Sequence, residues 1–367
     1  MKAQNLKRYR KEMVGCTYCG YCKDVCPVFT EEGWDSSVAR GRMALCYGLY
    51  TGEIEPDASV LERLYQCTTC ADCVRRCPSG SRVVDVVEAA RKDIAAAGLA
   101  GDAQKKIHGS IKKFGNPFGE STKRSDMLGE TPHKADIAYF AGCTATYRNK
   151  ETAKAAISIL KKLKADYTVL NETCCGSVLQ RLGFPDADLH KLVEANLAAI
   201  EATGAKTVLF SCAGCLRMFR KEYPLVKKFD FKAMHFAEWL ASQDLTPKLR
   251  PLKKIVTYHD PCHIGRHLGI YDAPRELIKK IPGVTFKEMS TKKEAALCCG
   301  GGGGVRAAFP DLSKRIAAKR VKQAEFADLL ITTCPFCVNN LKMGKDDIGS
   351  KVEIKDLLEV IDGLLEG

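Results

Sequence analysis

The sequence predicts an α+β protein of several domains, in which a helical N-terminal domain precedes two α/β domains with parallel sheets. Nine of its 19 cysteines lie before residue 95, among short helical stretches with little strand character. From Asp136 onward, short apolar runs alternate with amphipathic stretches, a pattern typical of a parallel sheet covered by helices. In this second part, matching cysteines recur at nearly constant spacing, which indicates two copies of one fold.

The predicted domain boundaries follow these changes in composition. The helical domain covers residues 1–100 and is followed by a polar stretch, 101–133, which is rich in Gly, Lys and Ser and contains two prolines. We expect that stretch to be a partly irregular linker. The two α/β domains then cover residues 134–248 and 249–367.

Each α/β domain is predicted from strands that end in cysteine. Apolar runs predict buried strands at 137–143, 207–212, 254–262 and 328–334, and amphipathic runs predict helices at 150–164, 188–204 and 311–326. Each domain closes with a further helical stretch, 236–243 or 354–365. The offset between corresponding cysteines is 119 to 124 residues, as in Cys143 and Cys262, Cys174 and Cys298, and Cys212 and Cys334.

The helical domain contains the pattern C-x2-C-x2-C-x3-C-P twice, as CTYCGYCKDVCP (16–27) and CTTCADCVRRCP (67–78). In bacterial ferredoxins, three cysteines of such a run hold one cluster and the fourth binds the other cluster. We therefore expect one 4Fe-4S cluster on Cys16, Cys19, Cys22 and Cys77, and a second on Cys26, Cys67, Cys70 and Cys73. Zinc sites leave the third cysteine and the x3-C-P ending unexplained. Cys46 is expected to be a small buried apolar residue.

Five cysteines recur in each α/β repeat. They are Cys143, Cys174, Cys175, Cys212 and Cys215 in the first repeat, and Cys262, Cys298, Cys299, Cys334 and Cys337 in the second. Five thiolates exceed the needs of one cubane or one zinc ion, so either one is spare or the cluster is not an ordinary cube. Gly176 and Gly300 follow the paired cysteines and allow a close backbone approach. Vicinal disulfides are the alternative, but they require strained rings and leave the C-x2-C pairs unused.

Two further features flank the second set. The run GGGGGVR (300–306) lacks the Gly-Lys-Ser/Thr ending of a phosphate-binding loop and an acidic ribose partner, so a nucleotide site is rejected. His259, Asp260 and His263 lie beside Cys262. They could donate hydrogen bonds to cluster sulfur or supply a proton, although capping and strand-end packing are the more common roles of such residues.

Composition excludes several classes of function. The net charge is +13, yet the basic residues are scattered rather than gathered in one arm, so nucleic acid is not an expected partner. No apolar segment is long enough for a secretory signal or a membrane span, so a membrane would be reached only through a partner. An odd number of cysteines in a chain of this size fits the reducing cytoplasm.

The motifs together resemble the CCG family of iron-sulfur proteins, and in particular its heterodisulfide reductase branch of the D-subunit type. The resemblance covers nearly the whole chain and rests on YHDPCHIGRHLGIYDAPRELI (258–278), LCCGGGGGVRAAFP (297–310) and TCPFC (334–337). It implies a two-cluster ferredoxin domain joined to two CCG domains. It also implies that each five-cysteine set is catalytic and holds a noncubane 4Fe-4S cluster, although the spacing alone does not fix that geometry.

The resemblance implies an enzyme subunit that reduces a disulfide such as CoM-S-S-CoB to two thiols. Electrons would come from a flavoprotein or cytochrome b partner in a hetero-oligomer. The alternative is a noncatalytic relay subunit of a flavin-dependent glycolate, lactate or glycerol-3-phosphate dehydrogenase, or of a sulfate-respiration membrane complex. Such relay subunits often lack cysteines of the C-x2-C ends, whereas both sets are complete here, which favours the disulfide-reducing branch.

Overall fold

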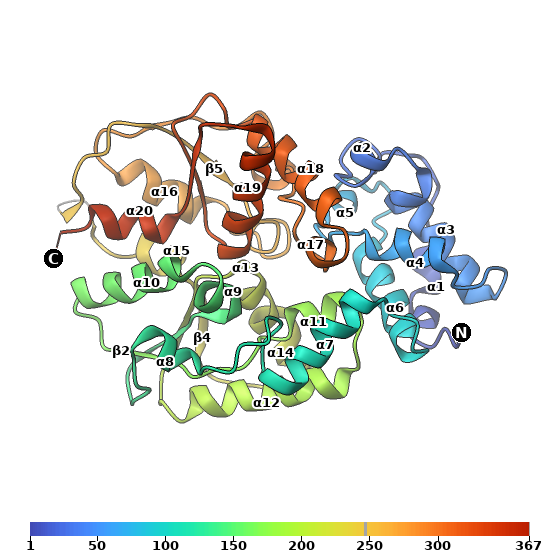
Figure 1. Ribbon diagram of the computed structural model, residues 1–367, viewed down its shortest axis with the longest axis horizontal. Coiled ribbons are helices and arrows are strands. Elements are labelled where there is room, and N and C mark those ends of the chain that lie inside the picture. The colour runs from blue at the N-terminus through green and yellow to red at the C-terminus, as the bar shows by residue number, and fades with distance from the viewer. Residues whose placement is uncertain (246–247, 367) are drawn as a thin grey trace.

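A computed structural model describes residues 1–245 and 248–366, with a helical domain beside two sheet-containing domains (Figure 1). Residues 1–100 contain only helical elements, as predicted. Buried side chains of α3 and α6, among them Met43, Val86 and Val87, form part of the core of this domain. Its α-helices are α1 (Arg10–Val14), α2 (Phe29–Glu32), α3 (Ala39–Thr51), α4 (Ala58–Tyr65), α5 (Asp72–Arg76) and α6 (Val83–Ala96).

The two following domains each contain a four-stranded parallel sheet of the same topology. The strand orders are β2-β1-β3-β4 and β6-β5-β7-β8, and every pairing is parallel. This confirms the predicted α+β class with two tandem α/β domains. The strands are β1 (Ile137–Phe140), β2 (Tyr167–Val169), β3 (Thr207–Phe210), β4 (Lys232–His235), β5 (Ile255–His259), β6 (Thr285–Phe286), β7 (Leu329–Thr332) and β8 (Glu353–Asp356).

The four predicted strands are the central pair of each sheet, while the edge strands were not predicted. Central strands are buried on both faces and therefore form continuous apolar runs. The edge strands β2, β4, β6 and β8 are short, and none contains an apolar run as long as those of the central strands. The expected helix at 354–365 is partly wrong for this reason, because its first residues belong to β8. The helix α20 (Leu357–Leu364) begins after Asp356, and the Asp356 carboxylate accepts a hydrogen bond from the Leu358 backbone N–H.

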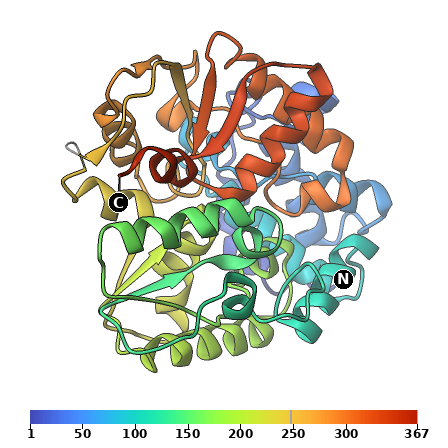
Figure 2. The ribbon, with the colours of Figure 1, turned by 60° about the vertical axis from the view of Figure 1, so that its left-hand side comes forward.

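Helices cover both faces of each sheet. Figure 2 shows the first sheet between α10 in green and α12 in yellow-green, with α20 in dark red lying against α10. The helices of the first repeat are α9 (Gly142–Tyr147), α10 (Lys150–Lys162), α11 (Ser177–Leu182), α12 (Asp186–Glu201), α13 (Ala213–Arg217), α14 (Tyr223–Val226) and α15 (Phe236–Ala241). Those of the second are α16 (Asp272–Lys280), α17 (Val305–Ala308), α18 (Pro310–Lys322), α19 (Pro335–Ile348) and α20.

The stretch expected to be a linker contains two helices, α7 (Asp102–Phe114) and α8 (Arg124–Leu128), separated by a loop. Ile111 is buried and Phe118 packs against the core of the helical domain. The segment therefore has packed structure of its own and is more than a connection between domains. Within residues 1–245 and 248–366, no helix combines the length and apolar character needed to cross a bilayer.

One buried arginine joins all three domains. The Arg91 guanidinium in α6 donates to the carbonyl oxygens of Leu64 and Cys67 in its own domain, of Arg181 in the first repeat and of Gly303 in the second. Gly303 has a positive φ of 62°, and a side chain there would collide with the Cys67 carbonyl. The glycine run therefore packs closely against the cysteine loop at 67–70. This close approach explains why the run consists of glycines, and no nucleotide-binding role is needed.

Candidate metal centres

The first N-terminal group of cysteines surrounds a cavity. The cavity is lined by all four cysteines predicted for one cluster, Cys16, Cys19, Cys22 and Cys77, and also by Cys73. Cys19 is the only exposed cysteine among the described residues. Burial raises the pKa of the Cys16 and Cys22 thiols, so ligation by these sulfurs would require a cation that stabilises their thiolates.

The two cysteine loops share one backbone conformation. Tyr18 and Gly20 in the first loop have positive φ angles, and Thr69 and Ala71 occupy the same positions in the second loop, also with positive φ. Non-glycine residues adopt this conformation at an energetic cost that is usually repaid at a functional site. Both loops are therefore folded in the same way around their cysteines.

The second N-terminal group joins Cys26 to Cys67, Cys70 and Cys73. Burial raises the pKa of Cys73 well above its ordinary value, and the neighbouring Cys70, Cys67 and Cys26 raise it further. The buried guanidinium of Arg42 lies beside Cys67 and Cys26 and supplies positive charge there. The structure thus places the fourth cysteine of each motif beside the first three of the other motif.

In the first repeat, the cysteines follow the carboxyl ends of parallel strands, where open α/β sheets place their binding sites. Cys143 follows β1 in the first turn of α9, Cys212 is the N-cap of α13, and Cys215 lies in that helix. The Cys143 thiol contacts Cys174, which contacts Cys175. Cys175 in turn contacts Cys215, and Cys215 contacts Cys212, so that five sulfurs form one continuous group.

A buried ion pair adjoins this first group. Arg124 of α8 donates from Nη2 to the Cys143 sulfur at 3.0 Å, and its Nε lies 3.5 Å from the Glu172 carboxylate. Glu172 also accepts from the Gly142 backbone N–H at 2.8 Å. Hydrogen bonds from the Cys174 and Cys215 thiols lower the pKa of Cys175 to about 6 in spite of its burial.

The second repeat forms the same arrangement. Cys262 contacts Cys298, Cys298 contacts Cys299, Cys299 contacts Cys337, and Cys337 contacts Cys334 at the N-terminus of α19. Cys298 accepts from the Gly300 N–H just as Cys174 accepts from the Gly176 N–H, and both glycines have positive φ. This is the close backbone approach expected after the paired cysteines.

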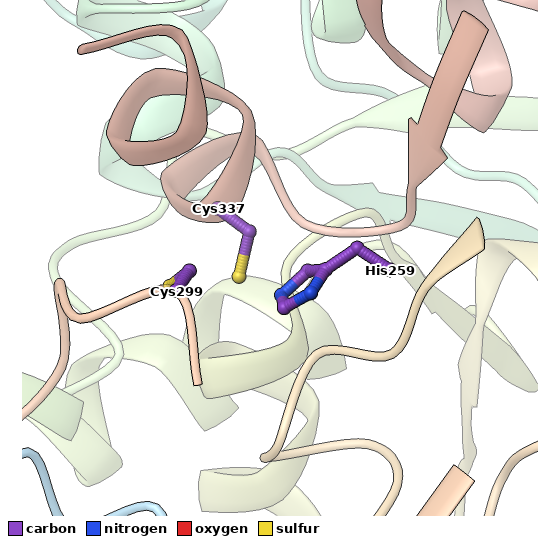
Figure 3. Close-up of side chains that lie close together, drawn as sticks. All are labelled: His259, Cys299 and Cys337. Atoms are coloured by element: carbon purple, nitrogen blue, oxygen red, sulfur yellow. The ribbon is translucent and has the colours of Figure 1, made fainter. Parts of the chain in front are cut away.

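The polar residues beside Cys262 differ in their surroundings. The Asp260 carboxylate accepts two hydrogen bonds from Arg275, at 2.6 and 2.9 Å. Asp260 therefore has a structural role, which is the more common role expected for the polar residues beside Cys262. His263 stacks edge-on against His267 and lies beside Gly214 of the first repeat. His259, at the end of β5, lies close to Cys299 and Cys337 (Figure 3).

The four cysteine groups are continuous across the domains. Cys73 lines the cavity of the first N-terminal group, and Cys70 contacts Cys298 of the second repeat. Cys334 of that repeat contacts Cys212 of the first repeat. Eighteen thiols therefore form a row that runs from the exposed Cys19 through the second repeat to the first.

The donor set fits iron-sulfur clusters. All nineteen cysteines are free thiols, and eighteen of them are gathered in groups of four, four, five and five sulfurs. Thiolate sulfur suits iron-sulfur clusters, while one tetrahedral zinc cannot use five sulfurs. Cys46 lies apart from the row, and burial raises its pKa to about 12, as expected for a small apolar core residue.

The buried arginines around these groups were not predicted from the sequence. Arg124 comes from the expected linker, Arg42 and Arg91 from helices of the first domain, and Arg320 from α18. Arg124, Arg42 and Arg91 adjoin cysteine residues, and Arg320 adjoins His259. Single arginines on amphipathic helices are ordinary in sequence. Only the folded chain reveals that these four are buried.

Comparison with known proteins yields two domain matches. The cysteine-rich domain matches residues 137–220 and 256–342, and the 4Fe-4S dicluster domain matches residues 12–81. The chain is 37% identical to the D-type subunit of the dihydromethanophenazine:CoB–CoM heterodisulfide reductase of Methanosarcina barkeri, over 95% of this chain and 93% of that protein.

Two further relatives and one solved structure place the chain more broadly. It is 31% identical to the B-type subunit of the fumarate reductase (CoM/CoB) of Methanothermobacter marburgensis, over 96% of this chain and 72% of that one. It is 26% identical to a probable glycolate oxidase iron-sulfur subunit of Bacillus subtilis, over 95% and 93%. A hypothetical protein from Helicobacter pylori has a similar fold, with a TM-score of 0.59 and 12% identity over 89% of this chain and 68% of the other.

Proposed function

The chain belongs to the CCG family of iron-sulfur proteins related to the D-type subunit of heterodisulfide reductase, and from that premise we propose that it delivers electrons to a small disulfide and releases two thiols. The family makes it an oxidoreductase subunit with a 4Fe-4S dicluster domain and two cysteine-rich domains. The observation that carries the proposal is the unbroken row of cysteines, in which Cys70 meets Cys298 and Cys334 meets Cys212.

The proposed ligands are the eighteen cysteines of this row. Clusters bound there would supply one-electron carriers and, at the repeats, iron able to bind sulfur. The first N-terminal site would use Cys16, Cys19, Cys22 and Cys77, and the second Cys26, Cys67, Cys70 and Cys73. The repeats would use Cys143, Cys174, Cys175, Cys212 and Cys215, and Cys262, Cys298, Cys299, Cys334 and Cys337.

Exposure of Cys19 suggests where a partner subunit delivers electrons. Two large side chains close to it in the sequence, Tyr18 and Tyr21, are exposed at 48% and 54%. Exposed aromatic residues are typical of protein interfaces. The proposed donor is a flavoprotein or a cytochrome b that docks on this face, and a membrane would be reached only through that partner.

The two repeats are proposed to act on one substrate because their cysteines meet. A disulfide takes up two electrons and two protons to give two thiols. The contact between Cys212 and Cys334 supports a shared site at which both repeats would reach the same sulfur pair. The proposed substrate is the CoM–CoB heterodisulfide named in the 37% identical relative.

Anaerobically purified protein with full iron and acid-labile sulfide content tests this function. We expect oxidation of reduced benzyl viologen that depends on CoM-S-S-CoB, with EPR signals that change when coenzyme M or coenzyme B thiol is added. The two homodisulfides serve as specificity controls. Absence of turnover and of thiol-dependent signals in fully loaded protein would contradict disulfide reduction.

That negative outcome would favour a second function, electron relay to or from a flavin dehydrogenase. The 26% identity to the glycolate oxidase iron-sulfur protein supports it. The completeness of both five-cysteine groups favours disulfide reduction, because relay subunits of this type often lack cysteines of the C-x2-C ends.

A further inference from the structure

His259 connects the second five-cysteine group to a buried arginine. It is the last residue of β5 and is 1% exposed. Its Nδ1 accepts a hydrogen bond from Arg320 Nε at 3.1 Å. One ring nitrogen and the sulfurs of Cys299 and Cys337 all lie within 4.8 Å of one another, and Figure 3 shows the ring edge directed toward both sulfurs.

The arginine determines which ring nitrogen carries the proton. A guanidinium has only N–H groups and donates in every hydrogen bond, so Nδ1 must offer its lone pair to Arg320. A neutral imidazole then carries its single proton on Nε2. Nε2 has no hydrogen-bond partner among the described residues, so its N–H is free to serve a sulfur acceptor.

Burial and hydrogen bonds fix the conformation of the Arg320 side chain. Its side chain is fully buried, and Nη1 donates to the Thr291 carbonyl at 2.8 Å and to the Gln323 side chain at 2.6 Å. Fixed in this way, its Nε–H points at His259. The arrangement belongs to the second repeat alone, because Phe140 occupies the matching position at the end of β1.

We propose that His259 is a fixed hydrogen-bond donor from Nε2 to the Cys299 sulfur, with Arg320 as its positioning residue, and that it raises the reduction potential of the second five-cysteine site. Hydrogen bonds to cluster sulfur favour the reduced, more negative state. The inference rests on the proposed cluster at this site and not on the disulfide substrate. No change in the protonation of His259 is involved.

The same geometry argues against His259 as a metal ligand. An imidazole nitrogen must be unprotonated to bind iron. Because Arg320 already uses the lone pair of Nδ1, binding through Nε2 would leave the ring without any proton. Donation to Cys299 satisfies both nitrogens, while ligation would not.

Redox titrations followed by EPR test the proposal on holoprotein without substrate. In His259→Phe, which copies the first repeat, we expect the reduced-to-oxidised ratio of one five-cysteine site to fall at least tenfold at fixed potential, equivalent to a downward shift of about 59 mV for one electron. His259→Gln keeps an N–H donor and should recover part of the shift. Arg320→Met should lower the potential, and Arg320→Lys should restore it.

The control is Thr257→Val, an isosteric change two residues earlier on the same face of β5, at a hydroxyl without a partner among the described residues. It should leave every potential unchanged, and unchanged cluster content and N-terminal EPR signals would show that the variants fold. An exchangeable proton coupling in pulsed ENDOR should disappear in His259→Phe. A strong nitrogen coupling of a directly bound imidazole, or unchanged potentials in fully loaded His259→Phe, would overturn the proposal.

Discussion

The two cysteine-rich repeats contain the same five cysteines on the same sheet topology, but their surroundings differ. The first group adjoins the buried pair of Arg124 and Glu172 and has Phe140 at the strand end. The second group has His259 in that position and contacts Cys70 of the helical domain. Duplication thus preserved the cysteine positions, while the neighbouring residues diverged to give each site its own electrostatic environment and place in the row.

In the proposed function, this difference would also give the two sites an order. Cys70 of the helical domain contacts Cys298 of the second repeat, so in the proposed function electrons that arrive through Cys70 would reach the second repeat first and the first repeat afterwards. The first repeat lies at the far end of the row. There the cation of Arg124, which donates to Cys143, can balance negative charge that accumulates on the site.

The largest effect is expected where the two repeats meet. Cys334→Ala removes a sulfur that contacts both Cys337 and Cys212, so we expect disulfide reduction to be abolished while the N-terminal cluster signals remain in the EPR spectrum. Cys46→Ala, at the cysteine outside the row, should retain turnover. If Cys334→Ala still turned over at the rate of Cys46→Ala, the second repeat would not be part of the catalytic site.

Arg124→Met tests the ion pair that is particular to the first repeat. The change leaves the Glu172 carboxylate buried without its cation, and breaking a buried pair in this way costs about 3–5 kcal/mol. We expect a lower midpoint of urea denaturation, partly restored in the double variant with Glu172→Gln. The exposed pair of Arg148 and Glu120 supplies the control, since Arg148→Met should change stability by less than about 1 kcal/mol. Equal effects of both arginine changes would contradict the assigned role.

Gly303→Ala tests the contact that only the second repeat makes with the helical domain through its glycine run. The substitution combines a strained positive φ with a collision at the Cys67 carbonyl, and we expect a cost of about 1–3 kcal/mol and slower reduction of the repeat clusters by rapid-mixing EPR. Gly349 has nearly the same φ, 61°, and no neighbouring atom within 4 Å. Gly349→Ala therefore isolates the backbone strain and should leave the rate of internal reduction unchanged. Similar rates in the two variants would exclude a role of the collision.

A feature was predictable from the sequence when the residues that form it lie close together in the chain. The cysteine groups and the central strands β1, β3, β5 and β7 are local patterns, and their spacing predicted the fold correctly. The edge strands have no continuous apolar run, and their pairing is decided by the sheet that they join. Arg124 and Arg320 are ordinary helical residues in sequence, and their positions beside Cys143 and His259 arise only from tertiary packing.

The smallest effect is expected at the edge strands, where the repeats differ in charge. Glu353 of β8 accepts a hydrogen bond from Lys254 and lies beside Lys355, and these hydrogen bonds lower the pKa of Glu353 to about 2. In the first repeat, Lys232 occupies the matching position of β4. Because the folded pKa lies below the unfolded value, the stabilisation is present above about pH 4.5 and is lost as the pH falls toward 2. All three side chains are more than a third exposed, so Glu353→Gln should cost less than about 1 kcal/mol at pH 7. Thermal denaturation should detect the loss of stability in Glu353→Gln at low ionic strength but not in about 1 M salt, where the charges are screened. A loss of stability that persists in high salt would assign the effect to packing instead.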